Sequence, residues 1–295
     1  MKYFFLVPNE DKDPKGEATK RIRTYLEERG CVCKVRKPFC ELSGEKGCTA
    51  SGQTRSYKYT DPAQVPEKTQ CVIVLGGDGT LIQAARDLAD LAIPFIGVNL
   101  GTLGYLAELD IQSVEESLDA LIEDKMVVQE RMMVAGTLIR DGQVIEENIA
   151  LNEVVLGRGG ALNVIRFTVE VNGKFLNSYA ADGVILSTPT GSTGYNLSAG
   201  GPILEPDSSM MLMTPISPHS MINRSIVFAD TAEVEITLTK TGAAGALAAF
   251  DGNGCVVEVQ DNDRIKIRKS EKKTKIMTLS KESFLEILRN KMSGE

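Results

Sequence analysis

Residues 71–86 read CVIVLGGDGTLIQAAR, and this stretch decides the fold of the first part of the chain. Cys71–Leu75 is an apolar run of the length expected for a strand buried on both faces, as in a parallel sheet. A glycine turn, Gly76–Thr80, follows it, and Leu81 begins a helical spacing of apolar residues. A strand, a turn and a helix in this order place the turn at the carboxyl end of a sheet, where open α/β folds bind ligands.

Asp78 is the carboxylate at the centre of this turn. The glycines allow backbone N–H groups to approach an anion closely, and the helix N-terminus adds partial positive charge. A carboxylate would repel that anion, so its presence indicates a general base, a metal ligand or a hydroxyl anchor. The alternative is an ordinary glycine turn whose aspartate caps the helix.

Length and charge limit the possible classes of protein. The 295 residues are enough for two domains or one large one, and 33 Lys and Arg against 40 Asp and Glu give a net charge of −7. This balance argues against nucleic acid or an anionic membrane as the main partner. No apolar run has the length of a membrane span, and Met1–Val7 is too short for a signal peptide, so we expect a cytoplasmic protein.

The first part of the chain alternates predicted strands and helices. Glu17–Arg29 has helical spacing and ends at Gly30, and Ser113–Glu116 has the pattern of a capping box that opens a further helix. Further strands are predicted at Tyr3–Val7, Cys31–Val35 and Ile93–Val98. This alternation predicts a doubly wound, mostly parallel sheet over residues 1–125. Pro38–Glu67 has no clear period and is predicted to be a long surface loop.

The pattern changes near Met126. From there to Leu279, short alternating strands are separated by Asp-Gly and Asn-Gly pairs at residues 141, 172 and 251, which are typical of tight hairpins. The clearest strands are Ile165–Val171, Glu233–Thr239, Cys255–Val259 and Asp263–Lys269. Residues 126–279 are therefore predicted to form an all-β, antiparallel sandwich. Residues 280–295 are predicted to form a helix that returns to the first domain.

Two polar segments interrupt the β pattern. Asp182–Pro202 is rich in hydroxyl side chains and glycines, which suits a polar ligand that needs many short-range donors. A Ser/Thr-rich loop that satisfies its own turns is the alternative. Asn152 and Glu153 begin another apolar strand, and on their own they are typical of a strand that starts at the surface.

Other candidate chemistry is weaker. His219 is the only histidine, and a lone histidine is more often structural than catalytic. Four cysteines near the N-terminus lack a paired C-x-x-C pattern, which favours reduced structural thiols over a metal or redox site: Cys31, Cys33, Cys40 and Cys48. No P-loop, dinucleotide G-x-G-x-x-G or G-x-S-x-G motif is present.

Taken together, the motifs resemble those of the NAD kinase family. Gly76–Thr80, Gly97–Leu106, Asn152-Glu153 and Asp182–Ser198, followed by Pro218–Ser220 with Arg224, come in that family's order and spacing. The GGDG segment alone is shared with lipid and sugar kinases, but the combination is highly specific. The resemblance covers nearly all of the chain from Cys71 onward, whereas Pro38–Glu67 has no match.

The resemblance implies ATP-dependent phosphorylation of the adenosine 2′-hydroxyl of NAD to give NADP. Asp78 would accept the proton of that hydroxyl, and Asn152 would read the adenine. The implied NAD contacts are Asp78, Gly79, Asn152, Glu153, Asp182, Thr190, Thr193, Gly194, Tyr195, Ser198 and Asn253. The implied contacts to the ATP phosphates are Gly76, Gly77, Gly79, Thr80, Asn99, Gly101 and Gly104. Mg²⁺ or another divalent cation would arrive with ATP, without a fixed protein site.

The family also implies a homodimer or homotetramer that assembles through the β domain. This chain departs from the family pattern at Gly194, where alanine is common, and at Asn253, where glutamine is common. Two alternatives remain open. One is a lipid or sugar kinase that shares the GGDG turn, and the other is a redox-sensing NAD(P)-binding protein without catalysis. The expected substrates are NAD and ATP, with polyphosphate as the alternative donor.

Overall fold

A computed structural model describes residues 1–37, 59–101, 104–107, 109–160, 163–219, 223–241, 245–252, 255–279 and 284–293. The chain divides into two compact units. Unit 1 comprises the described residues among Met1–Glu130 and Thr274–Glu295, and unit 2 comprises those among Arg131–Lys273. The chain passes from one unit to the other within two long strands, β6 (Val127–Arg140) and β17 (Arg264–Thr278).

Unit 1 contains a parallel sheet. Its strands run in the order β2-β1-β3-β4, and β4 also pairs in parallel with β5 and with the end of β17 at Ile276. The strands are β1 (Tyr3–Pro8), β2 (Val32–Val35), β3 (Cys71–Gly76), β4 (Phe95–Asn99) and β5 (Leu109–Asp110). All residues of β3 and β4 are buried, as expected for central strands covered on both faces.

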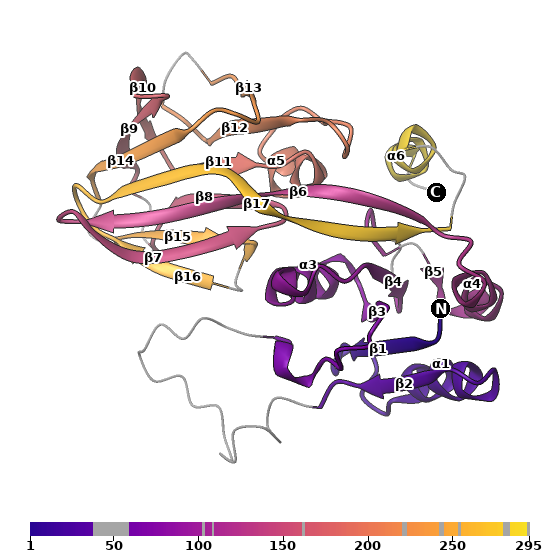
Figure 1. Ribbon diagram of the computed structural model, residues 1–295. Helices are drawn as coiled ribbons and strands as arrows, with labels where there is room; N and C mark the ends of the chain where they lie inside the picture. The colour runs from indigo at the N-terminus through magenta and orange to yellow at the C-terminus, as the bar shows by residue number, and fades with distance from the viewer. Residues whose placement is uncertain are drawn as a thin grey trace. The chain divides into compact units, whose positions relative to one another are not determined.

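Helices cover both faces of this sheet (Figure 1). Ile22 of α1 (Glu17–Glu28) and Leu118 of α4 (Val114–Ile122) share one core with Phe4 and Ile73. Leu81 of α3 (Asp78–Asp87) packs on the other face, where a Cβ built on Gly97 would meet its Cδ1 at 3.0 Å. The doubly wound arrangement predicted from the alternating pattern is confirmed. α6 (Phe284–Ser293) also belongs to unit 1, and its Lys291 lies over the Tyr105 ring at 5.6 Å.

Helix ends agree only in part with the predictions. Gly30 has a φ of +76° just beyond α1, which confirms it as the residue that ends the helix. The prediction of a capping box at Ser113 is wrong, because the Ser113 side chain makes no capping hydrogen bond. A short turn, η3 (Ile111–Ser113), precedes α4 directly, and Asp110 Oδ1 caps that turn by accepting from the Gln112 N–H at 2.9 Å. Two other short turns are η1 (Pro62–Gln64) and η2 (Ala89–Leu91).

Unit 2 contains two antiparallel sheets. The first has the order β13-β12-β11-β8-β15-β16, and the second has the order β10-β9-β14-β17, with β6 pairing β17 and β7 (Figure 1). One core draws on both sheets, for example through Leu156 and Phe250 from the first and Phe167 and Ile236 from the second. The predicted β-sandwich is confirmed. Its remaining strands are β7 (Gln143–Ala150), β8 (Glu153–Arg158), β9 (Ile165–Val171), β10 (Lys174–Ala181), β11 (Gly183–Ser187), β12 (Met210–Ile216), β13 (Ile226–Ala229), β14 (Val234–Lys240), β15 (Ala246–Phe250) and β16 (Cys255–Val259).

The predicted hairpin turns have the backbone that their sequences require. Asp141, Asn172 and Asp251 have φ values of 49°, 51° and 51°, and the glycine after each also has a positive φ. At Asp141-Gly142 and Asn172-Gly173, which join directly paired strand ends, two consecutive left-handed residues match the twist of the antiparallel pair. Asp251 and Gly252 instead begin a longer connection, because Phe250 pairs with Cys255. Among the described residues, no helix is long and apolar enough to cross a bilayer.

Candidate functional site

Asp78 lies at the first turn of α3, at the carboxyl end of β3. The helix begins at Asp78 rather than at Leu81, so the glycine turn is shorter than predicted and Gly77 is the N-cap residue. The Asp78 side chain does not cap its own helix. Its Oδ2 accepts from the Tyr105 N–H at 2.7 Å, and its Oδ1 accepts from the N–H groups of Leu106 and Ala107 at 3.1 Å each. The two glycine turns of unit 1 are therefore joined through this carboxylate.

Two positions in these turns must be glycine because side chains of α3 lie close to their backbone. A Cβ on Gly104 would lie 1.9 Å from Asp78 Oδ1, and one on Gly76 would lie 2.5 Å from Thr80 Oγ1. Gly79 is different, because a Cβ there would meet no heavy atom within 4 Å. Gly79 is exposed, so the glycine leaves space beside Asp78 at the start of the helix. An anion could reach the backbone amides there without meeting a side chain.

The other predicted phosphate contacts of unit 1 hold the turns in shape. Thr80 is buried, and its Oγ1 accepts from Asn9 Nδ2 at 2.8 Å. Asn99, also buried, bridges its own turn: its Nδ2 donates to the Gly101 carbonyl at 2.7 Å and its Oδ1 accepts from the Gly101 N–H at 3.0 Å. The Asn99 side chain is thus committed to the turn, which leaves backbone groups for a ligand.

In unit 2, the backbone of Asn152 and Glu153 is fixed by Asp251. The Asp251 carboxylate accepts from the N–H groups of Leu151 at 2.7 Å, Asn152 at 2.7 Å and Glu153 at 3.2 Å. On the other side, the Thr188 N–H donates to the Asn152 carbonyl at 2.8 Å. The pair is therefore not an ordinary strand start at the surface, because Glu153 is only 7 % exposed.

Three polar atoms near this pair are buried without a hydrogen-bond partner among the described residues: Asn152 Oδ1, Glu153 Oε2 and Thr190 Oγ1. Buried polar atoms are normally paired, so unpaired ones grouped in one segment indicate a missing ligand. Burial, and secondarily the charge of Asp251, raises the pKa of Glu153 to about 8. Glu153 therefore carries a proton over much of the neutral range and can donate as well as accept.

The glycines of the 190–194 segment allow it to lie against Asn152. This segment forms η4 (Thr190–Thr193), and a Cβ on Gly191 would lie 2.3 Å from the Asn152 carbonyl oxygen. A Cβ on Gly194 would lie 3.3 Å from Asn152 Nδ2 and 3.7 Å from Glu153 Oε2. The structure thus brings together Asn152, Glu153, Thr190 and Gly194, four of the predicted NAD contacts.

Within the same loop, Ser192 and Asn196 are structural. Ser192 Oγ donates to the Pro189 carbonyl at 2.6 Å, and Asn196 Nδ2 donates to the carbonyls of Ser192 and Pro202 at 3.0 and 2.9 Å. Both side chains are fully buried. This confirms part of the self-satisfying loop considered above, while Thr190 remains available to a ligand.

The remaining predicted NAD contacts of unit 2 lie around this loop. Thr193 Oγ1 donates to the Thr190 carbonyl at 3.3 Å. Tyr195 and Ser198 are exposed at the two ends of α5 (Tyr195–Ser198). Asp182 is half-buried, and its Oδ1 accepts from Arg158 Nε at 2.8 Å. Asn253 lies outside the described residues.

Histidine and cysteine chemistry finds little support. His219 is exposed, and its backbone N–H donates to the Ala180 carbonyl at 2.8 Å. Burial raises the pKa of the Cys31 thiol and raises that of Cys33 to about 12. Raised values suppress the reactive thiolate, which disfavours these two cysteines as a redox input. Cys40 and Cys48, like most of Pro38–Glu67, lie outside the described residues.

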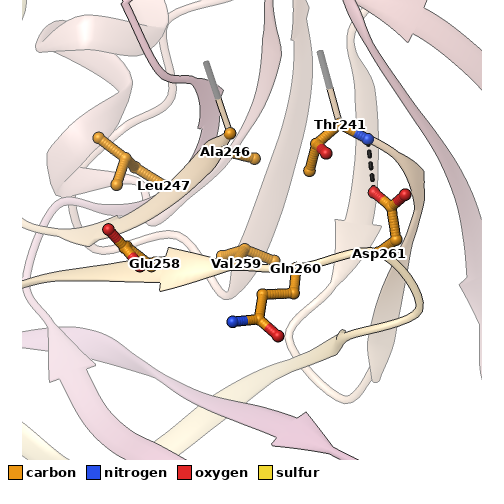
Figure 2. A pocket seen from close by; sticks show the side chains of 8 residues that line it. Thr241, Ala246, Leu247, Glu258, Val259, Gln260 and Asp261 are labelled. Carbon is orange, nitrogen blue, oxygen red and sulfur yellow. Dashed lines mark hydrogen bonds between the residues drawn. The ribbon is translucent and has the colours of Figure 1, made fainter. Parts of the chain in front are cut away.

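A separate pocket of about 420 Å³ lies near the ends of β15 and β16 (Figure 2). Two carboxylates, Glu258 and Asp261, line it, and Asp261 Oδ1 accepts from the Thr241 N–H at 2.6 Å. None of its described lining residues is basic, and none is a predicted site residue. A phosphorylated nucleotide would be repelled there, so we do not assign the site to this pocket.

Sequence reasoning missed several residues that shape the site. The Asp-Gly pattern at Asp251 predicts only a turn, although the Asp251 carboxylate holds the backbone of a segment 100 residues away. Asn9 and Lys12, in the loop after β1, belong to no sequence motif. An aspartate with a positive φ can form a turn with its backbone and accept distant hydrogen bonds with its side chain. The Asp-Gly sequence pattern indicates only the turn.

Two known domain families match this chain. The ATP-NAD kinase N-terminal domain family matches residues 4–126, and the ATP-NAD kinase C-terminal domain family matches residues 151–279. This chain belongs to the ATP-NAD kinase family. Among similar proteins are the NAD kinase of Lachnospira eligens, 46% identical over 99% of this chain and 100% of its own length, and that of Lachnoclostridium phytofermentans, 40% identical over 100% of both chains.

Solved structures of this family share its fold. Yeast NADH kinase complexed with NADH matches with a TM-score of 0.79 at 24% identity, covering 100% of this chain and 88% of that one. An NAD kinase from Archaeoglobus fulgidus in complex with ATP matches with a TM-score of 0.75 at 22% identity, covering 99% of both. The predicted resemblance to ATP-NAD kinases and the predicted fold class are both confirmed.

Proposed function

We propose that this ATP-NAD kinase family member transfers the γ-phosphoryl group of ATP to the adenosine 2′-hydroxyl of NAD, giving NADP and ADP. The observation that carries the proposal is the Asp78 carboxylate, held between two glycine turns at the carboxyl end of β3. The curated relatives are NAD kinases along their whole length, which supports the same reaction in this chain.

Asp78 is proposed as the proton acceptor. The 2′-oxygen attacks the γ-phosphorus, the bond from that phosphorus to the ADP oxygen breaks, and the hydroxyl proton passes to the carboxylate. A carboxylate has about four lone-pair positions, so the three backbone N–H groups leave one for the hydroxyl. A loose phosphoryl transition state allows late proton transfer, so positioning contributes most of the catalysis.

The donor phosphates are proposed to lie against the amides of Gly77, Gly79 and the α3 N-terminus. The space beside Gly79 and the partial positive charge of a helix start both support this placement. Mg²⁺ is proposed to enter with ATP, where it neutralises phosphate charge.

The NAD is proposed to contact unit 2 through Asn152, Glu153 and Thr190. Their unpartnered atoms supply an amide acceptor, a carboxyl group and a hydroxyl, which match the mixed donors and acceptors of a nucleoside. An asparagine amide can pair with both the amino group and a ring nitrogen of adenine. The exposed side chains of Tyr195 and Ser198 are proposed to complete this contact.

The protein is further proposed to assemble as a homo-oligomer and to act in the cytoplasm. A homodimer or homotetramer formed through unit 2 would cover exposed apolar side chains such as Phe175, which is 64% exposed. The cysteines within the described residues are free thiols, as expected for a protein that acts in the cytoplasm.

The test is incubation of the purified protein with NAD, ATP and Mg²⁺, with NADP read by an NADP-specific dehydrogenase. The proposal expects NADP and ADP to appear in equal amounts. Parallel reactions with a diacylglycerol, a sugar phosphate or inorganic polyphosphate separate the other GGDG kinases and the alternative donor. Absence of NADP from every reaction, with NAD still bound, would instead support a non-catalytic NAD-binding protein.

A further inference from the structure

The ammonium group of Lys12 lies against both glycine turns of unit 1. A Cβ built on Gly77 would lie 2.9 Å from Lys12 Nζ, and one built on Gly101 would lie 3.7 Å from it. Within the described part of the chain, no carboxylate forms an ion pair with Lys12. Among the described residues, this cation therefore has no ion-pair partner, and it lies beside glycines that carry no side chain.

The loop that carries Lys12 is fixed to the glycine turn. Asn9 Oδ1 accepts from the N–H groups of Asp11 at 3.0 Å and Lys12 at 3.1 Å, and Asn9 Nδ2 donates to Thr80 Oγ1 at 2.8 Å. The Asn9 N–H donates to the Leu75 carbonyl at 2.8 Å. Asn9 thus links the segment after β1 to the end of β3 and to the start of α3, and it sets the position of the Lys12 backbone.

We propose that Lys12 binds the transferred phosphoryl group of the donor nucleotide and that Asn9 positions it. The inference rests on the proposed function and adds a residue to the donor site that no motif in the sequence marks. Charge on the transferred group is spread over its three equatorial oxygens, and a fixed ammonium stabilises it. The proton of the 2′-hydroxyl goes to Asp78, so Lys12 takes no part in the proposed proton transfer.

The geometry also accounts for the missing P-loop lysine. A P-loop kinase places its lysine and its glycine loop in one segment, whereas this chain has no such motif. Here the lysine comes from the loop after β1 and the glycines from the loop after β3, and the parallel pairing of β1 with β3 places the ends of both strands together. The two parts of a phosphate site therefore come from neighbouring strands.

The decisive variant is Lys12→Met, with Lys15→Met as its matched control. Both remove one positive charge from an exposed lysine before α1, but Lys15 makes no contact with a glycine turn within the described residues. We expect Lys12→Met to lower kcat/KM for ATP by roughly 10- to 100-fold while KM for NAD stays within about twofold. Calorimetric titration of MgATP without NAD should show weaker binding to Lys12→Met only.

The role of Asn9 is tested by a double-variant cycle. Asn9→Ala should lower kcat/KM for ATP in the same direction, and adding it to Lys12→Met should cause little further loss. A purely structural asparagine would instead lower activity by the same factor in both backgrounds. KM for NAD and the melting temperature of each variant are measured alongside.

Equal ATP affinity and equal kcat/KM in Lys12→Met and Lys15→Met would overturn the inference. If the wild-type protein formed no NADP, the proposed function would fail instead, and the ATP titration alone would then decide the role of Lys12. Weaker ATP binding in Lys12→Met would support it even then, and unchanged binding would reject it.

Discussion

The Tyr105 N–H donates to Asp78 Oδ2 across 2.7 Å, and this hydrogen bond joins the turn after β4 to the turn after β3. The N–H groups of Leu106 and Ala107 reinforce it from the same segment. Asp78 is therefore aligned by backbone groups, whose positions are set by the parallel sheet. A base oriented in this way loses little freedom when a hydroxyl binds.

Replacing Gly104 should disturb this arrangement, whereas replacing Gly79 should not. In Gly104→Ala the new methyl overlaps Asp78 Oδ1 at 1.9 Å, so the turn must move, and we expect a loss of about 2 kcal/mol in unfolding free energy together with most activity. Thermal unfolding and NADP formation measure the two effects. A Gly104→Ala protein as stable and active as wild type would contradict the geometry.

Gly79→Ala is the matched substitution, because its methyl would meet no protein atom within 4 Å. Alanine favours a helix interior over glycine by up to about 1 kcal/mol, so the melting temperature should stay the same or rise. We expect KM for ATP to increase because the methyl occupies the proposed phosphate space. Unchanged KM for ATP would place the phosphates elsewhere.

Asp251 should matter for stability and for NAD binding. Asp251→Asn replaces a charged acceptor of three backbone N–H groups, and we expect it to cost about 1–2 kcal/mol and to weaken NAD binding. Asp141→Asn is the control, since Asp141 also has a positive φ in an Asp-Gly turn but lies exposed. Equal stability and equal NAD affinity of the two variants would contradict the role of Asp251 in holding the backbone of Asn152 and Glu153.

Glu153 should make stability depend on pH. Burial and the Asp251 charge raise its pKa from 4.5 to about 8, so the folded protein holds this proton more tightly than the unfolded chain does. The resulting stability is fully present below about pH 4.5 and is lost as pH rises through about 8. Glu153→Gln keeps a neutral side chain, so its melting temperature relative to wild type should rise with pH across this window. Parallel curves for the two proteins would exclude a raised pKa.

The sheet of unit 1 and the hairpins of unit 2 could be predicted because their signals are local. Cys71–Leu75 is apolar throughout because β3 is covered on both faces. Asn172-Gly173 marks a hairpin because both residues adopt a positive φ. The apolar spacing predicts a helix from Leu81, whereas α3 begins three residues earlier, since Asp78-Gly79-Thr80 contains no apolar residue with helical spacing.

Contacts between distant segments could not be predicted. Asn152-Glu153 alone suggested a surface strand, and only the motif resemblance marked it as a site, whereas the structure buries Glu153 under the 190–194 segment. Asn9 and Lys12 follow a strand without any motif, so their proximity to Thr80 and Gly77 emerges only from the parallel pairing of β1 and β3.

The most direct test of the central claim is turnover of Asp78→Asn, measured beside its affinity for NAD. Asparagine keeps one oxygen for the turn amides but cannot take up a proton from the 2′-hydroxyl. We predict that kcat falls by about 100-fold or more, with the dissociation constant for NAD within about threefold of wild type. Turnover close to the wild-type rate would show that Asp78 is not the proton acceptor.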